Sequence, residues 1–372
     1  MLNLSEPINE LKKILKPSKY KKIFILTGKN SFYLSGIDKI LKKSLTNQEC
    51  CFFFKKSKIP EVKELTNIIK KLNKFNPDLV LAIGGGSVLD YAKIANNIRD
   101  LENLKKNIIY SNYKIKKKYP VLAIPTTAGS GAEVTPNAVI YIGKIKYSIE
   151  DNLLVPDFFL IIPEIVMGLK KTIKASSGFD AIAQGIESLI SKKSNDKSVN
   201  FATKSLKISL ENYIDFIKKP NIGNTYKMCL AANFSGKAIS ISRTTAPHAL
   251  SYPFTSHYGI NHGHAVSLTL NEFLKFNYEN IKYADCKFSL KERYNILFKL
   301  TKASNINELN LFIKSLKKKA NLETNFKKLK INANNSMLKI LSGVNLQRLV
   351  NNPIKINISD LKIILKGKYN EN

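Results

Sequence analysis

The chain has 372 residues, 44% of them hydrophobic, and a formal net charge of +32. Such a charge alone would suggest a nucleic-acid partner. However, all except four of the 60 basic residues are lysine, whereas phosphate recognition favours arginine forks and interleaved aromatic rings. We therefore expect no nucleic-acid partner. The four cysteines show no CxxC spacing and no apolar run approaches the roughly 20 residues that span a bilayer, which favours a cytoplasmic protein with no membrane partner.

The first half of the chain alternates β-branched or aromatic runs with amphipathic stretches, a pattern typical of βαβ units and a parallel sheet. Three runs predict buried strands, namely KIFILT (22–27), LVLAIGGG (79–86) and YPVLAIPTT (119–127), and the second runs directly into a helix, SVLDYAKIANNI. Ligands of a parallel sheet bind beyond the carboxyl ends of its strands, so we expect these three ends to converge.

From about Ile173 the pattern changes to long helical periodicities such as SGFDAIAQGIESLIS. A chain of this length exceeds one typical hydrophobic core. The sequence therefore predicts an α/β domain over residues 1–172 and an all-helical domain over residues 173–372.

The turn after the second predicted strand is rich in glycine. Gly85, Gly86 and Ser87 open the following helix, so backbone N–H groups there can approach a pyrophosphate with no Cβ in the way, and the helix dipole favours the anion. The spacing is neither GxGxxG nor a P-loop, and a tight strand–helix connection is the alternative.

A second polar loop, PTTAGSGAEVT (125–135), follows the next predicted strand. Thr126, Thr127 and Ser130 are candidates for hydrogen bonds to the same nucleotide. The alternative is a loop that merely caps a helix starting near Glu133.

All four histidines, His248, His257, His262 and His264, fall within 17 residues of the second half. Upstream, Asp180 and Gln184 lie four residues apart on one face of a predicted helix. Imidazole and carboxylate are usual ligands of Fe(II) and Zn(II). We therefore predict a metal site of Asp180, His248 and His262 with Gln184 as a fourth ligand; the alternative is that these histidines are hydrogen-bonded core residues.

Four segments, GGGSVLDYAK, PTTAGSGAEVT, SGFDAIAQGIES and PHALSYPFTSHYGINHGHA, resemble the iron-containing (group III) alcohol dehydrogenase superfamily in order and interval over nearly the whole chain. The resemblance implies a dehydroquinate synthase-like fold, with an N-terminal dinucleotide-binding α/β domain and a C-terminal helical domain. It also implies an NAD(P)-dependent alcohol/aldehyde reaction at a divalent metal between the two domains, and a homodimer.

Carried over position by position, Asp180, His248 and His262 match the aspartate and the two later histidine ligands of that superfamily. Gln184 stands where typical members have a histidine ligand, so the resemblance leaves the metal open between Fe(II), which the family favours, and Zn(II). Tyr252 stands where typical members have a histidine near the nicotinamide, which makes Tyr252 or His257 the expected proton donor.

Gln184 combined with TTAPHALSYPFTS and HGHAV resembles one branch, the phosphonoacetaldehyde reductases of phosphonate biosynthesis. A dianionic phosphonate needs fixed donors and positive charge, which we expect from Lys237, Arg243, Thr244 and Thr245. A surface or interdomain salt bridge is the alternative for Arg243. For the enzyme activity there are two alternatives. One is a generic iron-containing alcohol dehydrogenase that acts on short-chain alcohols, and the other is a dehydroquinate-synthase-like or glycerol-1-phosphate dehydrogenase activity.

Cofactor choice rests on the end of the first predicted strand. Members of the superfamily often place an aspartate there to bind the adenosine ribose, whereas this chain has Gly28 followed by Lys29. Losing a carboxylate and gaining a cation should admit a 2′-phosphate, so we expect NADPH to be used as well as NADH. Lys146, in the segment KIKYS, is expected to reach the nicotinamide ribose.

Overall fold

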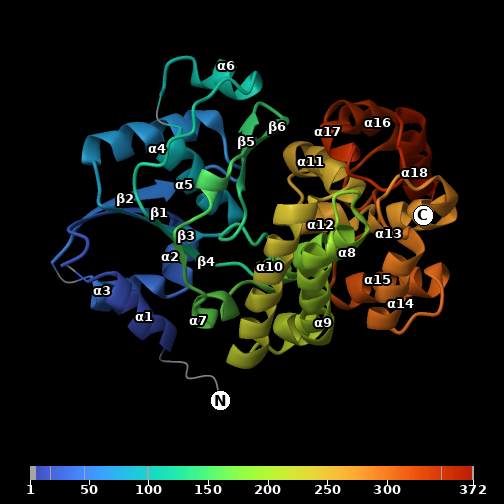
Figure 1. Ribbon diagram of the computed structural model, residues 1–372, viewed down its shortest axis with the longest axis horizontal. Coiled ribbons are helices and arrows are strands. Elements are labelled where there is room, and N and C mark those ends of the chain that lie inside the picture. Colours follow the sequence, from blue (N-terminus) through green and yellow to red (C-terminus); the bar gives the residue numbers. More distant parts are fainter. Residues whose placement is uncertain (1–5, 17, 46, 99, 345, 371–372) are drawn as a thin grey trace. The chain divides into compact units, whose positions relative to one another are not determined.

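The computed structural model describes residues 6–16, 18–45, 47–98, 100–344 and 346–370 (Figure 1). The chain divides into two compact units. Unit 1 comprises residues 1–127 and 131–169, and unit 2 comprises residues 128–130 and 170–372. The short segment 128–130 therefore belongs to the second unit although it lies between two parts of the first.

Unit 1 is built on a five-stranded parallel sheet with the order β2-β1-β3-β4-β7. Its strands are β1 (Lys22–Gly28), β2 (Glu49–Lys55), β3 (Leu79–Gly84), β4 (Val121–Pro125) and β7 (Phe158–Phe159). The three predicted strands are thus present as β1, β3 and β4. Because β1 pairs with both β2 and β3, the chain changes direction across the sheet between β1 and β3, the position at which open α/β sheets bind ligands.

Helices cover both faces of this sheet, which is why β3 is buried along its whole length and reads as a continuous apolar run. Figure 1 shows α4 and α5 on one face and α1, α2 and α3 on the other. On the first face, Phe24 and Leu26 of β1 and Val80 of β3 join one core with apolar residues of α4 and α5. The helices and 3-10 turn of unit 1 are α1 (Glu6–Ile14), α2 (Lys29–Leu34), α3 (Ile37–Ser44), α4 (Val62–Phe75), α5 (Gly86–Asn97), α6 (Leu104–Ile109), η1 (Asn152–Leu154) and α7 (Pro163–Met167).

The polar loop after β4 does not lead into a helix near Glu133, so that alternative is wrong. The chain continues as a loop to β5 (Asn137–Ile142), which forms an antiparallel hairpin with β6 (Ile145–Glu150). Pro136 disfavours helical backbone in the preceding residue. The buried ammonium of Lys93, on α5, instead binds the backbone carbonyls of Thr135 and Asn137 at 2.8 and 3.0 Å.

The regular elements of unit 2 are all helices or 3-10 turns in its described residues, as the sequence predicts. Its elements are α8 (Lys171–Ile190), α9 (Asp196–Lys218), α10 (Ile222–Ser242), α11 (Ala246–Tyr258), α12 (His262–Ser267), α13 (Leu270–Glu279), η2 (Ile281–Tyr283), α14 (Leu290–Thr301), α15 (Ile306–Lys319), α16 (Ala333–Ser342), α17 (Leu346–Leu349) and α18 (Ile358–Asn370). Helix α8 is the centre of this unit and packs against α9, α10, α12 and α14. Two glycines allow the closest approach to α9, because a Cβ on Gly178 or Gly185 would lie 2.7 Å from the Tyr213 ring or 2.9 Å from Leu206.

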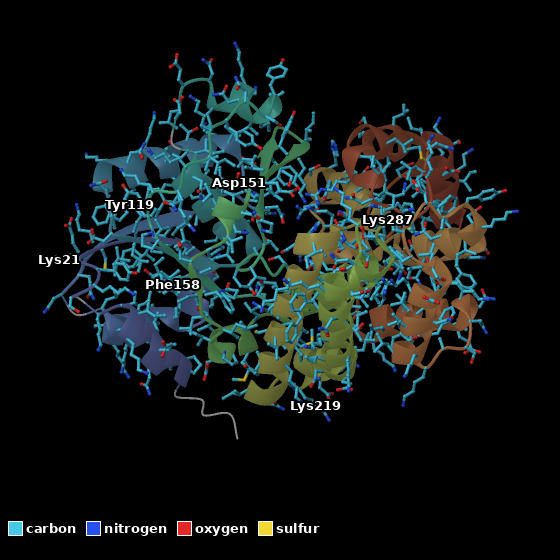
Figure 2. All side chains as sticks on the ribbon, in the orientation of Figure 1. Lys21, Tyr119, Asp151, Phe158, Lys219 and Lys287 are labelled. Atoms are coloured by element: carbon cyan, nitrogen blue, oxygen red, sulfur yellow. The ribbon has the colours of Figure 1, made fainter. Side chains whose placement is uncertain are left out.

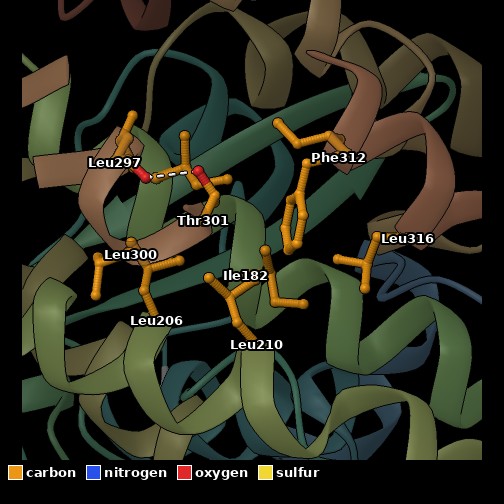
Figure 3. A pocket seen from close by; sticks show the side chains of 10 residues that line it. Ile182, Leu206, Leu210, Leu297, Leu300, Thr301, Phe312 and Leu316 are labelled. Atoms are coloured by element: carbon orange, nitrogen blue, oxygen red, sulfur yellow. Dashed lines mark hydrogen bonds between the residues drawn. The ribbon is translucent and has the colours of Figure 1, made fainter. Parts of the chain in front are cut away.

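A small apolar hollow lies beside α8 in the core of unit 2 (Figure 3). Its lining is entirely aliphatic or aromatic except for Thr301, whose hydroxyl donates to the carbonyl of Leu297 at 2.8 Å and is thereby satisfied. The hollow offers a ligand no polar contact.

The positive charge is spread over the surface. Figure 2 shows side chains ending in nitrogen projecting from the outline of each unit, with Lys21 on unit 1 and Lys219 and Lys287 on unit 2 among them. All four cysteines are free thiols. In the part of the chain that the structure describes, no helix combines the length and the apolar character needed to cross a membrane.

Candidate metal centre

One face of α8 carries three polar side chains, Asp180, Gln184 and Glu187. Their spacing of four and then three residues stacks them along the same side of the helix. None of the three is more than 4% exposed. Buried polar groups are costly unless they are paired, so the partners of these side chains define what the face does.

Helices α11 and α12 bring two imidazoles to Asp180. The Nε2 atom of His248 lies 3.2 Å from Asp180 Oδ1, and the Nε2 atom of His262 lies 4.0 Å from the same oxygen. One donor atom from each of the three residues lies within 4.8 Å of the other two. Two imidazole nitrogens and one carboxylate oxygen in this arrangement fit a divalent metal such as Zn(II) or Fe(II), and they leave further coordination positions open.

Gly263 explains how His262 reaches α8. A Cβ on Gly263 would lie 2.0 Å from the backbone oxygen of Ser176 and 2.7 Å from the Cβ of Asp180. Only a glycine therefore allows the first turn of α12 to contact α8 at this point. The neighbouring backbone N–H of His264 donates to the Ser176 hydroxyl at 3.0 Å, which fixes the approach.

Glu187, which the sequence analysis did not single out, orients His248. One of its carboxylate oxygens is in close contact with His248 Nδ1, and the other accepts the backbone N–H and the hydroxyl of Thr245, each at 2.9 Å. Burial opposes a charge on His248, but Glu187 and Asp180 outweigh it and raise the pKa of His248 to about 10. A carboxylate on Nδ1 directs Nε2 toward the cluster, an arrangement typical of metal-bound histidines.

The other residues expected to act in proton transfer have different environments. Tyr252 is buried, and its ring stacks on that of His262 with a centroid distance of 6.0 Å. His257 lies exposed in the last turn of α11. The ring of His264 is directed to the backbone oxygen of Glu323 at 2.7 Å, and burial lowers its pKa. Of these three, Tyr252 is the residue whose ring stacks on a member of the metal cluster.

Gln184, predicted as a fourth ligand, directs its amide nitrogen at the cluster. Its Nε2 lies 3.3 Å from Asp180 Oδ2 and 3.5 Å from the backbone oxygen of Ser130. Its Oε1, the atom that would ligate a metal, accepts the hydroxyl of Ser235 at 2.9 Å.

The predicted substrate residues precede His248 in sequence. Arg243 follows α10 with φ 63° and ψ 170°, a conformation that residues other than glycine adopt at a cost of about 1–3 kcal/mol. Its guanidinium donates to the Ser240 carbonyl at 2.8 Å, and burial together with the nearby positive charge of Arg348 lowers its pKa. The hydroxyl of Thr244 is buried without a hydrogen-bond partner in the structure.

The remaining members of that predicted set are engaged elsewhere. Thr245 binds Glu187 through both its N–H and its hydroxyl. The ammonium of Lys237 lies over the rings of Phe201 and Phe234, at 6.0 and 5.7 Å from their centroids.

In unit 1, the structure brings the two predicted nucleotide loops together. Gly85 is the N-cap of α5 and provides no side-chain cap, and Gly86 and Ser87 begin the helix. A Cβ on Gly85 would lie 3.2 Å from the hydroxyl oxygen of Thr127, and the N–H of Thr126 donates to the carbonyl of Gly84 at 3.0 Å. The open helix N-terminus and the threonine loop thus form one continuous polar edge.

Three further nucleotide candidates have different settings, although Gly28 lies at the same end of the sheet as Gly84, since Thr27 pairs with Ile83. Gly28 ends β1, and its carbonyl accepts the hydroxyl of Ser31 at 3.0 Å. Lys146 lies on β6 near Asp90, whose pKa burial raises to about 6 against the opposing effect of Lys93 and Lys146. Ser130 belongs to unit 2, where its carbonyl accepts from Gln184.

Sequence models of two protein domains match this chain. The model described as iron-containing alcohol dehydrogenase matches residues 4–163, and the one described as Fe-containing alcohol dehydrogenase family, C-terminal, matches residues 174–369. The chain belongs to the iron-containing alcohol dehydrogenase family. The expected fold is confirmed, since solved members share it over nearly the whole chain.

Curated relatives in this family include enzymes with several substrates. Phosphonoacetaldehyde reductase of Streptomyces viridochromogenes is 31% identical over 59% of this chain and 58% of its own length. 4-Hydroxybutyrate dehydrogenase of Clostridium kluyveri is 29% identical over 59% of this chain and 60% of its own length. Aldehyde-alcohol dehydrogenase 2 of Entamoeba histolytica is 27% identical over 74% of this chain but 33% of its own length. The chain thus spans about three fifths, or less, of the curated relatives it matches.

Solved structures of the family cover more of the chain. Sulfoacetaldehyde reductase from Bifidobacterium kashiwanohense, in complex with NAD+, superposes with a TM-score of 0.86 at 26% identity, covering 98% of this chain and 95% of that one. An iron-containing alcohol dehydrogenase from Thermotoga maritima superposes with a TM-score of 0.79 at 24% identity, covering 98% and 95%. The second likeness supports the fold alone.

Proposed function

We propose that this iron-containing alcohol dehydrogenase reduces a short aldehyde that carries an anionic group, with phosphonoacetaldehyde as the substrate and 2-hydroxyethylphosphonate as the product. One observation carries the proposal. The metal cluster of Asp180, His248 and His262 lies in the same unit as Arg243 and Thr244, and the chain runs from these two residues directly into the helix that supplies His248.

The side chains of Asp180, His248 and His262 would hold the metal. We propose Fe(II), the ion for which the family is named, with Zn(II) as the alternative. When bound, the metal supplies a Lewis acid for the aldehyde oxygen. Glu187 occupies Nδ1 of His248 and so keeps Nε2 directed at the cluster. Tyr252 covers the ring of His262. These contacts hold the donor atoms in place before substrate arrives, which reduces the reorganisation needed during the reaction.

The reaction adds a hydride to the carbonyl carbon and a proton to the carbonyl oxygen. A bound reduced nicotinamide dinucleotide supplies the hydride and becomes NAD(P)+. For the proton we propose Tyr252 as the donor, relayed from water, in preference to His257, because Tyr252 contacts His262 whereas His257 is exposed at the end of α11. Gly85, Gly86, Ser87 and the loop of Thr126 and Thr127 bind the dinucleotide phosphates in this proposal.

The anionic group is proposed to bind Arg243. Arg348 lies close enough for its charge to act on Arg243, and the Asn351 amide, three residues later, donates to the carbonyl of Thr244 at 3.3 Å. Two of the four arginines of the chain therefore lie near one another, and a threonine with a buried hydroxyl directly follows Arg243. Guanidinium groups suit phosphonate, sulfonate and carboxylate oxygens, which accept several charge-assisted hydrogen bonds.

The names of three relatives point to the same substrate class. Phosphonoacetaldehyde, sulfoacetaldehyde and the aldehyde of 4-hydroxybutyrate each combine a short carbon chain with one anionic group. The competing candidate is a generic short-chain alcohol dehydrogenase, which the aldehyde-alcohol dehydrogenase relatives favour. Such an enzyme needs no anion site, so its activity would not depend on Arg243.

For the dinucleotide we propose use of NADPH as well as NADH, because Gly28 and Lys29 provide no carboxylate at the end of β1. The solved sulfoacetaldehyde reductase contains NAD+. Comparing catalytic efficiencies with the two dinucleotides tests the proposal, and a strong preference for NADH would contradict it. Gly28→Asp should reduce NADPH use while leaving NADH use nearly unchanged.

The decisive experiment follows nicotinamide oxidation with phosphonoacetaldehyde, sulfoacetaldehyde, 4-oxobutanoate and propanal, before and after chelation and after restoration with Fe(II) or Zn(II). We expect a preference for an anionic aldehyde, phosphonoacetaldehyde foremost, and loss of activity on chelation. Arg243→Ala should lower kcat/KM for the anionic aldehyde about 100-fold, since a charge-assisted contact contributes about 1.5–3 kcal/mol, and leave propanal almost unaffected. Equal rates on all four aldehydes, with no effect of Arg243→Ala, would favour the generic enzyme.

A further inference from the structure

The two ends of the Gln184 amide face different kinds of group. On the cluster side lie Asp180 Oδ2 at 3.3 Å and the backbone oxygen of Ser130 at 3.5 Å. A carboxylate at neutral pH and a backbone carbonyl can only accept hydrogen bonds. The amide end that meets both of them must therefore be the NH2 group, whose two hydrogens can serve both acceptors.

The opposite end of the amide faces a hydroxyl, which can donate a hydrogen bond to the amide oxygen. The hydroxyl of Ser235, on α10, lies 2.9 Å from Gln184 Oε1. Gln184 and Ser235 are both buried, with 3% and 0% of their surface exposed. Turning the amide over would direct Oε1 against the two acceptor oxygens of the cluster side. The Ser235 hydroxyl could then accept from the amide and donate to the carbonyl of Ala232, so the two acceptors on the cluster side decide the orientation. The network therefore holds Oε1 away from the cluster.

The two carboxylate oxygens of Asp180 have separate partners as a consequence. Oδ1 faces the Nε2 atoms of His248 and His262, whereas Oδ2 accepts from Gln184. A hydrogen bond to Oδ2 restrains the rotation of the carboxylate and keeps Oδ1 toward the imidazoles. This is the geometry of a ligand and its supporting donor, in which the donor fixes the ligand without touching the metal.

We infer that Gln184 is a positioning residue for Asp180, and that the protein supplies three metal ligands, Asp180, His248 and His262, in place of the four expected from sequence. The inference rests on the metal site of the proposed function. A site with three protein ligands keeps at least one more position open for water or substrate than a site with four, and it holds its ion less tightly. The protein then depends on Gln184 for the direction of Asp180.

The test uses the metal-free full-length protein reconstituted with Co(II), whose visible absorption reports the number and kind of ligands, together with a chelator competition that gives the Co(II) affinity. Gln184→Leu removes both the N–H donor and the amide oxygen at nearly constant volume. If Gln184 is a positioning residue, the bands of the bound ion should keep their energies and intensities, and the affinity should fall about 10- to 100-fold, as is typical when a supporting hydrogen bond is lost.

Three further variants make the result specific. Gln184→His introduces an imidazole at the same position, and it should change the bands and tighten binding, which shows that the spectrum detects a new ligand there. Ser235→Ala releases the far end of the amide and should lower the affinity by less than Gln184→Leu does. Ser209→Ala, a buried serine of α9 bonded to the Leu206 carbonyl of its own helix, is the matched control and should behave as the parent protein.

Loss or displacement of the absorption bands in Gln184→Leu would overturn the inference and make the amide oxygen a ligand, provided that thermal unfolding of the metal-free variant matches that of the parent. Failure of the parent protein to bind Co(II) would overturn it as well. Because no nucleotide or aldehyde is present in these measurements, a failure of the proposed reductase activity appears only in the aldehyde assays and leaves the coordination result intact.

Discussion

The polar edge of unit 1 and the metal cluster of unit 2 are built from different parts of the chain. At the edge, Gly85 and the residues that begin α5 present backbone N–H groups, and the important property is the lack of a Cβ. In the cluster, Asp180 and His248 present side-chain atoms that are almost fully buried, and His248 hydrogen-bonds both Asp180 and the equally buried Glu187.

This difference determines what each region tolerates. A backbone site should survive changes in many nearby side chains but lose affinity when a methyl group is added at the point of approach. A buried side-chain site should lose function when one polar atom is removed, because its neighbours are left unpaired. Variants in one region should therefore leave the binding property of the other region unchanged.

Asp180→Ala should have the largest effect. It removes the carboxylate that both imidazoles face, and metal assistance contributes several kcal/mol to transition-state stabilisation. We expect kcat/KM to fall at least about 1000-fold, the equivalent of about 4 kcal/mol, with metal content near zero and NADH affinity unchanged by fluorescence titration. Turnover within tenfold of the parent protein would contradict a metal-dependent reaction.

Gly263→Ala should disrupt the cluster without removing a ligand. The added Cβ would meet the backbone oxygen of Ser176 at 2.0 Å, so α12 must move away from α8 and carry His262 with it. We expect a loss of about 3 kcal/mol in unfolding free energy, at the upper end for an overpacked core, and a matching loss of metal by elemental analysis. Gly367→Ala, at an open position of α18, is the control, and an unchanged metal affinity in Gly263→Ala would show that the close approach does not place His262.

Glu187→Gln should act on the metal through His248. The substitution keeps the volume but replaces one acceptor oxygen by an NH2 group, which must face either His248 Nδ1 or the donors of Thr245. Facing Nδ1, it would favour the tautomer with a proton on Nε2, which cannot ligate. We expect the metal affinity to fall about 10- to 100-fold in a chelator competition. Glu211→Gln, exposed on α9, should have no effect, and equal affinities in the two variants would show that Glu187 serves packing alone.

The sequence predicted the elements whose character is local. Strand β3 and helix α8 were found because a continuous apolar run and a helical period are visible without knowledge of neighbours. Strand β2 was not singled out, because its residues are mostly half-buried and its pairing with β1 alone defines it. Strand β7 has two residues and exists only through pairing with β4.

The same distinction applies to the site. The density of histidines and the spacing of Asp180 pointed to a metal cluster, but the partners that decide roles are distant in sequence. Glu187 binds Thr245 and His248, which lie 58 and 61 residues later, and a helical glutamate by itself suggests an exposed position. Its place seven residues after Asp180, on the same helical face, was the signal available. For Gln184, Ser235 lies 51 residues away, so spacing alone could not show which end of the amide faces the cluster.

Gly85→Ala is expected to have the smallest effect on stability and tests the backbone site. Gly85 has φ −73° and ψ −179°, which alanine adopts without strain, and its Cβ would meet the Thr127 side chain, with the hydroxyl oxygen at 3.2 Å and Cγ2 at 3.4 Å. Unfolding free energy should therefore change by less than about 1 kcal/mol. The methyl group would occupy the approach to the helix N-terminus, so the NADPH dissociation constant should rise about tenfold, the equivalent of about 1.4 kcal/mol, while the Co(II) affinity stays unchanged. An unaltered NADPH dissociation constant would mean that the dinucleotide phosphates bind elsewhere. A parallel loss of Co(II) affinity would show that the two regions are coupled, so that the backbone site and the side-chain site are not independent in this protein.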